Sequence, residues 1–322
     1  MKQRPIVLLI LLLLLPVSLL VAVKTGSIAL TWQDILQSLS QPEHIHHQLL
    51  FELRLPRALA AFACGAMLAL AGVLMQALLR NPLADPYVLG VSGGAATGAL
   101  SAMLLGLGSL LVQGAAFVGA MLSILLVFML SRGHSSWTAQ RLLLTGVVLA
   151  AGWNAVISFL LSTSPDRHLH GMLFWLMGDL SQARLTMMPI VALFVISVIS
   201  FLLATQLNLL TRGELRATSL GVNTRRLQTL LFLAASLLTA IVMSMAGSIG
   251  FIGLMTPHIL RILIGADHRW LIPAALLAGG ILLTLADTLA RSIIAPVQLP
   301  VGVLTALLGV PTFLYLLYRS RA

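Results

Sequence analysis

The sequence predicts an all-α protein that crosses a membrane about ten times. The chain has 322 residues, of which 59% are hydrophobic and only 9% are charged, and its mean hydropathy is +1.03. Ordinary globular domains carry about 25% charged residues, so a chain this apolar must lie in lipid. A spanning helix needs ~20 apolar residues, which leaves room for roughly ten spans with short connections. We therefore read residues 1–322 as a single transmembrane domain.

Ten apolar runs are the expected spans, and polar or Gly- and Pro-rich turns separate them. The first run follows two basic residues and has a signal peptide as its alternative reading. That run is long for a signal peptide, and Ala22-Val23-Lys24 is a poor cleavage site, so we take it as a span kinked at Pro16. The expected spans are 6–23, 57–79, 87–106, 111–131, 141–162, 186–206, 227–246, 250–266, 271–291 and 302–319.

Two of the connections contain strong helix breakers. Between the second and third spans, residues 80–86 read RNPLADP, and the two prolines stop one helix and restart the next. Three glycines, the last of them Gly253, precede Pro257 at the start of the eighth run. This pattern predicts irregular backbone followed by a short helix, which membranes tolerate only where protein covers it.

The distribution of Lys and Arg predicts that both termini lie in the cytoplasm. With ten spans and an inside N-terminus, the inner side holds 13 basic residues and the outer side holds 6. An excess of basic residues marks the cytoplasmic side. The inner set is Lys2, Arg4, Arg80, Arg132, Arg141, Arg212, Arg216, Arg225, Arg226, Arg261, Arg269, Arg319 and Arg321, and the outer set is Lys24, Arg54, Arg57, Arg167, Arg184 and Arg291.

Three connecting segments are longer than simple turns. The outer segments are 25–55 and 163–185, and the second is long enough for a short interfacial helix anchored by Trp175. The longest inner segment is 207–226, whose middle reads as one or two helical turns bounded by Gly213 and Gly221. We expect no soluble domain and no linker between domains.

A ladder of small residues marks the third span. Gly90, Gly94, Gly98, Ala102 and Gly106 recur every four residues, which places them along one helical face. In lipid, such a face allows two helix backbones to approach closely. We predict that Gly90, Gly94 and Gly98 are helix-packing residues.

The sequence lacks the loop that would hold ATP. A Walker A loop needs Gly-Lys-Ser or Gly-Lys-Thr, whereas the only lysines, Lys2 and Lys24, do not follow glycine. If transport uses ATP, another polypeptide must hold the nucleotide. The basic residues are spread singly, as membrane loops require, so the net charge of +10 does not indicate a nucleic-acid partner.

Several residues have a chemical reading and a plainer one. Ser92, in Gly90-Val-Ser-Gly-Gly94, matches a nucleophile motif and could pair with His258 in an intramembrane serine protease. The plainer reading is one more small residue on the packing face.

Outer histidines could bind metal, but no Cys, Asp or Glu at ligand spacing completes a site, so we favour solvated histidines. They are His44, His46, His47, His168 and His170.

An acidic and a basic residue share the ninth span. Asp287 and Arg291 are four residues apart, and ionisable residues within a span are functional candidates by default. An intrahelical ion pair is an equal reading for Asp287. Arg291 should lie near the outer surface, where it could join Arg54 and Arg57.

Motifs distributed along nearly the whole chain resemble the FecCD family of ABC importer permeases, which take up ferric siderophores, haem and cobalamin. Together they are highly specific, although each is short. They are RLPR at 54–57, GVLMQALLRNPLA at 72–84, LG at 89–90, FWLMG at 174–178, LGV at 220–222, GFIGLMTPHILR at 250–261, DHR at 267–269, ADTLAR at 286–291, LPVG at 299–302 and GVPTF at 309–313.

The resemblance implies a type II ABC importer permease fold with ten helices per subunit, and a homodimer with the pathway at its centre. The fifth and tenth helices line the pathway in this family. Two ATP-binding cassette ATPase subunits would bind inside and would use the ATP, and a periplasmic or lipid-anchored substrate-binding protein would bind outside. The chain itself would be no enzyme and would carry no covalently bound cofactor and no metal. Its place would be the bacterial inner membrane.

The resemblance also assigns roles to residues. Arg54, Arg57 and Arg291 match arginines that receive acidic residues of the binding protein. Segment 207–226 matches the loop that docks on the ATPase. Its coupling residues here are Gly213, Glu214, Leu215, Arg216, Ser219, Leu220 and Gly221, and Thr138, Ala139 and Gln140 align with the cytoplasmic gate.

The resemblance leaves the transported chelate open. A ferric siderophore or cobalamin is the expected substrate, and haem is the third candidate. A secondary transporter that needs no ATPase is a further alternative, beside the protease.

Overall fold

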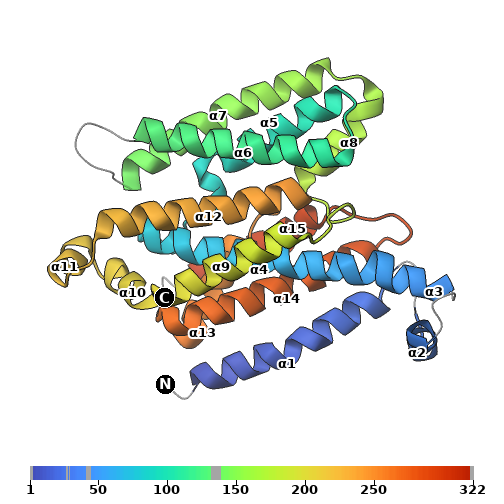
Figure 1. Cartoon of the computed structure of the whole chain (residues 1–322), viewed down its shortest axis with the longest axis horizontal. Coiled ribbons are helices and arrows are strands. Elements are labelled where there is room, and N and C mark those ends of the chain that lie inside the picture. Colours follow the sequence, from blue (N-terminus) through green and yellow to red (C-terminus); the bar gives the residue numbers. More distant parts are fainter. Residues whose placement is uncertain (1–2, 27, 29, 41–44, 132–138, 320–322) are drawn as a thin grey trace.

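The computed structural model describes residues 3–26, 28, 30–40, 45–131 and 139–319, which form helices and no strand (Figure 1). This confirms the all-α class. The α-helices are α1 (Gln3–Lys24), α2 (Trp32–Ser40), α3 (Ile45–Gln48), α4 (Leu55–Leu79), α5 (Val91–Leu104), α6 (Ser109–Ser131), α7 (Ala139–Thr163), α8 (Asp166–Met177), α9 (Met187–Leu202), α10 (Ala204–Thr211), α11 (Glu214–Ser219), α12 (Thr224–Ala246), α13 (Ile252–Ile264), α14 (His268–Ser292) and α15 (Val301–Arg319), with a π-helix η1 (Leu49–Arg54) and a 3-10 turn η2 (Pro86–Leu89).

Each of the ten expected spans coincides with a helix, but the count of ten spans is not confirmed. Six helices of the described residues are long and apolar enough to cross a membrane by themselves. A seventh arises if α9 and α10, which are bent by 63° at Leu203, count as one broken span. The helices α5, α13 and α15 are shorter. One reason is visible at α5, because Pro86–Leu89 form a separate turn instead of its first four residues.

Helix α4 forms the centre of the molecule, with α14, α12 and α13 packed around it (Figure 1). Its sequence is rich in Ala and Gly, and almost every residue from Ala60 to Leu79 is buried. Small residues let the neighbouring backbones come close. A Cβ on Gly65 would overlap the carbonyl of Gly279 in α14, and a Cβ on Gly72 would overlap that of Gly253 in α13. In lipid, such close packing replaces the hydrophobic effect as the force between helices.

Helices α5, α6, α7 and α8 form a second layer, which α12 separates from α4 in the view of Figure 1. Gly94 and Gly98 of α5 face the backbone of α6 so closely that a Cβ on either would overlap it. Helix α7 is tied to this pair by a chain of hydrogen bonds. Trp153 donates from Nε1 to Ser123 Oγ at 3.0 Å, and Ser123 donates to the Gly90 carbonyl at 2.8 Å.

The ends of the glycine ladder have other roles. Gly90 lies between η2 and α5 with φ +72°, a left-handed conformation that glycine adopts without strain. Gly106 also has a positive φ, of +69°, and a Cβ there would meet no atom within 4 Å. Gly106 therefore follows the end of α5 and does not extend the packed face, contrary to the expectation from the four-residue spacing.

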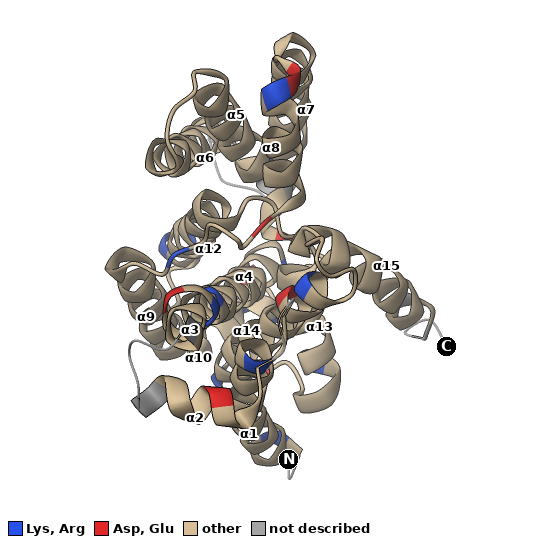
Figure 2. Ribbon diagram, turned by 90° about the vertical axis from the view of Figure 1, so that its right-hand side faces the viewer, with Lys and Arg blue, Asp and Glu red and all other residues tan. Residues whose placement is uncertain are grey.

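The outer segments hold more helix than expected. Segment 25–55 contains α2, and α3 and η1 continue into α4, so one helical stretch runs from Ile45 to Leu79. Segment 163–185 contains α8, where a short helix was expected. Figure 2, which faces the expected outer end, shows how sparsely the charged residues are distributed over the helices.

Candidate functional site

A cluster of arginines lies at the expected outer ends of α4 and α14. Its centre is Asp287, which is only 1% exposed. Arg57 forms a double contact with this carboxylate, with Nη2 2.8 Å from Oδ1 and Nε 3.0 Å from Oδ2. Arg291 Nε lies 3.2 Å from Asp287 Oδ2, in the i, i+4 relationship noted in the sequence. The intrahelical ion pair is therefore confirmed, and Asp287 also pairs with Arg57 of α4.

The other contacts of the cluster are to α1 and its following turn. Arg54 donates from Nη1 to the carbonyls of Val23 at 2.8 Å and Lys24 at 3.2 Å, and from Nη2 to that of Ile28. Arg291 Nη2 donates to the carbonyl of Ala22 at 2.9 Å. Carbonyls at a helix C-terminus lack intrahelical partners and carry negative partial charge. The two arginines thus cap α1.

Two of the three arginines that match docking residues are buried. Arg54 is 5% exposed and Arg291 is 6% exposed. They are buried because the end of α1 and the turn after it cover them. Arg57 is the more accessible member, and its Nη1 also contacts Gln298 Oε1 at 2.9 Å. All three still line one pocket of about 290 Å³, together with Gly26, Leu53 and Ser181 among others.

The charge of this pocket is not balanced. Three arginines line it, and its described lining contains no acidic side chain. The Asp287 carboxylate, which pairs with Arg57 and Arg291, lies behind this lining. Such an excess of positive charge in a recess attracts carboxylates. The arrangement can receive an acidic group from outside without losing the ion pairs that hold α4 to α14.

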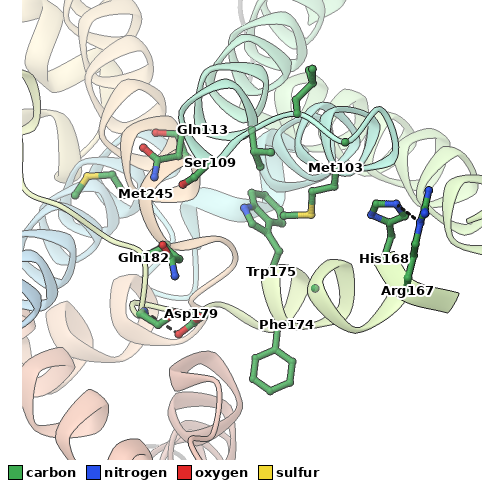
Figure 3. Close-up of a pocket in the computed structure, with 17 residues that line it drawn as sticks. Met103, Ser109, Gln113, Arg167, His168, Phe174, Trp175, Asp179, Gln182 and Met245 are labelled. Carbon is green, nitrogen blue, oxygen red and sulfur yellow. Dashed lines mark hydrogen bonds between the residues drawn. The ribbon is translucent and has the colours of Figure 1, made fainter. Parts of the chain in front are cut away.

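A larger cavity, of about 550 Å³, lies beside α8 at the same end of the molecule (Figure 3). Figure 3 shows Trp175 pointing into it near Met103 and Ser109, while Phe174 points away. Gln113, Gln182 and Asp179 supply polar groups to its wall. A mixture of aromatic surface with a few polar groups is typical of sites for small organic molecules.

The inner segment 207–226 folds into the end of α10, the short helix α11 and the start of α12. Gly213 has φ +126° and Gly221 has φ +83°, so glycine is favoured at both ends of α11. Between them, Leu215 is 88% exposed and Leu220 is 65% exposed. Ala217 is buried and holds the helix against the body of the protein. Two large apolar side chains on an otherwise polar protrusion indicate a contact surface.

The segment is linked to the second span by one exposed ion pair. Arg80 Nη2 lies 3.9 Å from Glu214 Oε2 at the start of α11. Arg80 has φ +50° and ends α4, so its side chain leaves the helix toward α11. Exposed pairs of this length contribute little stability, but this one connects α11 to the central helix.

The proposed gate residues are not described in full. Thr138 lies outside the described residues, and Ala139 and Gln140 begin α7 but their side chains also fall outside. His44 of the outer histidines lies outside as well. Of the others, His46 is 3.7 Å from Asp34, His47 contacts the Ser38 carbonyl, and His168 contacts Arg167. In the described ranges, no three potential metal ligands of the His, Cys, Asp and Glu types come together.

Ser92 and His258 do not form a dyad in the described contacts. Ser92 lies on α5, next to Gly93, which packs against Trp153. The His258 ring stacks edge-on against Phe313 of α15 at 5.7 Å, and its buried Nε2 has no hydrogen-bond partner in the described part of the chain. His258 thus packs between helices, and the described contacts give Ser92 no catalytic partner.

Residues 11–319 match the profile of the FecCD transport family, and the chain belongs to this family. It is 40% identical to the hemin transport system permease protein HmuU of Yersinia pestis, over 97% of this chain and 95% of that protein. It is 39% identical to the Fe(3+) dicitrate permease protein FecD of Escherichia coli, over 94% and 95%. It is 41% identical to the vitamin B12 permease protein BtuC of Citrobacter koseri, over 84% and 83%.

A solved structure agrees with this assignment. A transporter assigned to the metal-chelate type of ABC transporters, in an inward-facing conformation, superposes with a TM-score of 0.84 at 32% identity, over 98% of this chain and 99% of that one. The chain is therefore a membrane permease subunit of an ABC importer and not an enzyme. This excludes the serine protease and the secondary transporter. ABC importers of this family work with an ATPase and a substrate-binding protein.

Sequence reasoning missed the contacts that bury the arginines. Nothing in the RLPR motif shows that Arg54 caps α1, because the carbonyls it binds are about thirty residues earlier. The close packing of α4 at Gly65 and Gly72 was also missed, although small residues seven apart return to nearly the same helical face. That spacing was the available signal.

Proposed function

We propose that this chain imports a metal chelate across a bacterial inner membrane, as a homodimer with both termini in the cytoplasm. The observation that carries the proposal is the match over nearly the whole chain to permeases named for hemin, Fe(3+) dicitrate and vitamin B12. A ferric siderophore-type chelate or cobalamin is the proposed substrate, with haem as the alternative. Two ATPase subunits and one substrate-binding protein complete the proposed importer.

Surface features support the homodimer. One face of α15 exposes large apolar side chains, including Leu307, Leu314 and Tyr318. Helix α7 exposes Val148 and Phe159, and it also exposes Asn154 and Ser158 in the middle of an apolar span. Polar side chains in lipid are costly unless they face protein or water. We infer that α7 and α15 face the second subunit and a water-filled pathway between the subunits.

We infer that α11 transmits force from the ATPase. A permease without a nucleotide loop must be moved by contact, and Leu215 and Leu220 offer the apolar surface for it. Glu214, Arg216 and Ser219 would form the polar rim, while Gly213 and Gly221 set the two turns. Thr138, Ala139 and Gln140 remain the proposed cytoplasmic gate. Rigid-body movement of packed helices is an established way to turn such a contact into opening and closing.

At the outer end, we infer that the arginine pocket receives an acidic side chain of the binding protein. Arg57 would make the first contact, because Arg54 and Arg291 lie deeper. Contacts between opposite charges at a surface speed association and weaken with salt. The outer cavity beside Trp175 lies at the same end, where a delivered chelate would meet the permease.

The test is reconstitution with candidate binding proteins, each loaded with one chelate, and measurement of uptake into ATP-filled proteoliposomes. We expect ATP-dependent uptake of one chelate class and none with empty binding protein. Uptake that is independent of ATP, or absent for all three chelates while the complex assembles, would contradict the proposal.

A further inference from the structure

A groove of about 680 Å³ runs between α9 and α12 on the outside of the helix bundle. We call it the α9–α12 groove. Most of its wall is apolar, and the polar groups lie at one end, in the first turns of α12. The apolar residues are Ile196, Ile199, Leu230, Leu233, Ala234 and Leu237, and the polar ones are Arg225, Arg226 and Thr229.

The groove has the length of one membrane leaflet. From Arg225 to Leu237, α12 advances twelve residues, which at 1.5 Å per residue is about 18 Å. Half of a ~30 Å hydrocarbon core is about 15 Å. The arginines therefore lie at headgroup level when the apolar wall lies along the acyl chains.

Neither arginine has an acidic partner in the described part of the chain. Arg225 and Arg226 are exposed, and no ion pair to either is formed among the described residues. The first turn of α12 contains no acidic residue, and its N-cap is the neutral Asn223, which accepts from the Arg226 N–H at 3.0 Å. Two unpaired guanidinium groups above an apolar groove are complementary to a phosphate with an acyl chain.

A second cavity adjoins the mouth of the groove. It has a volume of about 560 Å³ and shares Arg226 and Leu230 with the groove. Its other wall includes Leu220 and Gly221, the residues that end α11. A headgroup at Arg226 would thus lie against the turn that holds the proposed coupling helix.

The groove lies away from the helices proposed to face the second subunit. In Figure 2, α9 and α12 are on the opposite side of the molecule from α15. The groove is therefore on a surface that faces lipid rather than the partner subunit.

We propose that the α9–α12 groove binds an anionic phospholipid of the inner leaflet. Its phosphate contacts Arg225 and Arg226, and an acyl chain lies along Leu230, Leu233 and Leu237. The bound lipid supports the turn at Leu220 and so regulates coupling to the ATPase. The assignment to the inner leaflet rests on the proposed orientation, in which the turns that connect α10, α11 and α12 lie in the cytoplasm.

The test uses the purified full-length permease after delipidation, without ATPase or chelate. Native mass spectrometry measures binding of phosphatidylglycerol and of zwitterionic phosphatidylethanolamine to the wild type and to Arg225→Gln/Arg226→Gln. Each basic residue near an anionic membrane surface contributes about a fivefold change in binding, so we expect a loss of ~30-fold for phosphatidylglycerol and little change for phosphatidylethanolamine. Arg212→Gln, on the same side but outside the groove, is the matched control and should bind as the wild type does.

A second variant tests the apolar wall. Ala234→Phe fills the groove and leaves both arginines in place, so it should weaken both lipids. Equal binding of phosphatidylglycerol by the double variant and the control would overturn the proposal. Equal loss of both lipids in the double variant would also overturn it. Full displacement of bound lipid by inorganic phosphate would overturn it too, because it would show a simple anion site.

A further outcome would assign the arginines to a protein partner. If the double variant loses ATPase co-purification but keeps phosphatidylglycerol, the ATPase and not a lipid uses them, and the proposal is overturned. Because lipid binding is measured without transport, failure of chelate uptake with intact lipid binding would count against the import proposal alone.

Discussion

Arg57 and Asp287, 230 residues apart in the sequence, form a partly buried ion pair with 2.8 Å between Nη2 and Oδ1. The pair joins α4, the central helix, to α14 at the expected outer end. Arg291 shares the same carboxylate. Among the described residues of this cluster, Asp287 is the acidic side chain that pairs with Arg57 and Arg291, and we expect the stability of the cluster to depend on it.

We expect Asp287→Asn to destabilise the permease by about 3–5 kcal/mol, because it leaves the buried Arg291 and the partly buried Arg57 without their counter-charge. Thermal unfolding in detergent measures this. Glu52→Gln, an exposed charge loss at the same end, is the control and should change little. If Asp287→Asn and Glu52→Gln unfold at the same temperature, Asp287 does not stabilise the cluster.

Binding-protein capture should depend on Arg57 and on salt. We expect Arg57→Gln to slow association several-fold at low ionic strength, because Arg57 is the accessible arginine of the pocket, and the difference should shrink as salt is added. Surface plasmon resonance with the immobilised permease gives the rates. Substituting Arg54 or Arg291 would be a poor test, since their loss also uncaps α1. Salt-independent capture that is equal in wild type and variant would remove Arg57 from the docking site.

Close packing of α5 on α6 predicts a sharp contrast between neighbouring residues. Gly98→Ala adds a Cβ that overlaps the α6 backbone and should lower the yield of folded permease strongly. Ser92→Ala keeps a small residue and should leave yield and uptake unchanged. Size-exclusion profiles and uptake assays separate the two. A folded but inactive Ser92→Ala variant would instead give its hydroxyl a role in transport.

The contacts of Asp267 predict that stability depends on pH at the turn between α13 and α14, which lies on the proposed cytoplasmic side. Burial raises the pKa of Asp267, but the Asn208 amide, the Arg269 N–H and the charges of Arg4 and Arg269 together lower this pKa below its usual value. A carboxylate with a lowered folded-state pKa contributes stability above the unfolded value of ~3.9, and this is lost as pH falls through the folded value.

Wild type should therefore be more stable than Asp267→Asn at neutral pH, and the difference should vanish toward strongly acidic pH. Unfolding midpoints measured across pH check this, with Asp166→Asn in the exposed first turn of α8 as the control. A difference that stays constant down to acidic pH would show that the charge of Asp267 is not what stabilises the turn.

The sequence predicted the positions of the helices well, because apolar runs and Pro- or Gly-rich turns act locally. It also predicted one or two helical turns between Gly213 and Gly221, where α11 lies. It did not predict the burial of Arg54 and Arg291, since this depends on where the end of α1 packs. Nor did it predict that α4 is the centre, because close contacts such as that of Gly72 with Gly253 join helices far apart in the chain.

Coupling through α11 is the central claim of this account, and ATPase activity coupled to uptake in proteoliposomes tests it most directly. Leu215→Asp/Leu220→Asp places two charges where an apolar contact is proposed, which costs several kcal/mol in a buried interface. Because both leucines are exposed in the permease, the variant should fold, as should the control Thr211→Asp. We predict that the double variant still captures the binding protein but loses ATP-driven uptake, while the control keeps it. Normal ATP-driven uptake by the double variant would contradict the account.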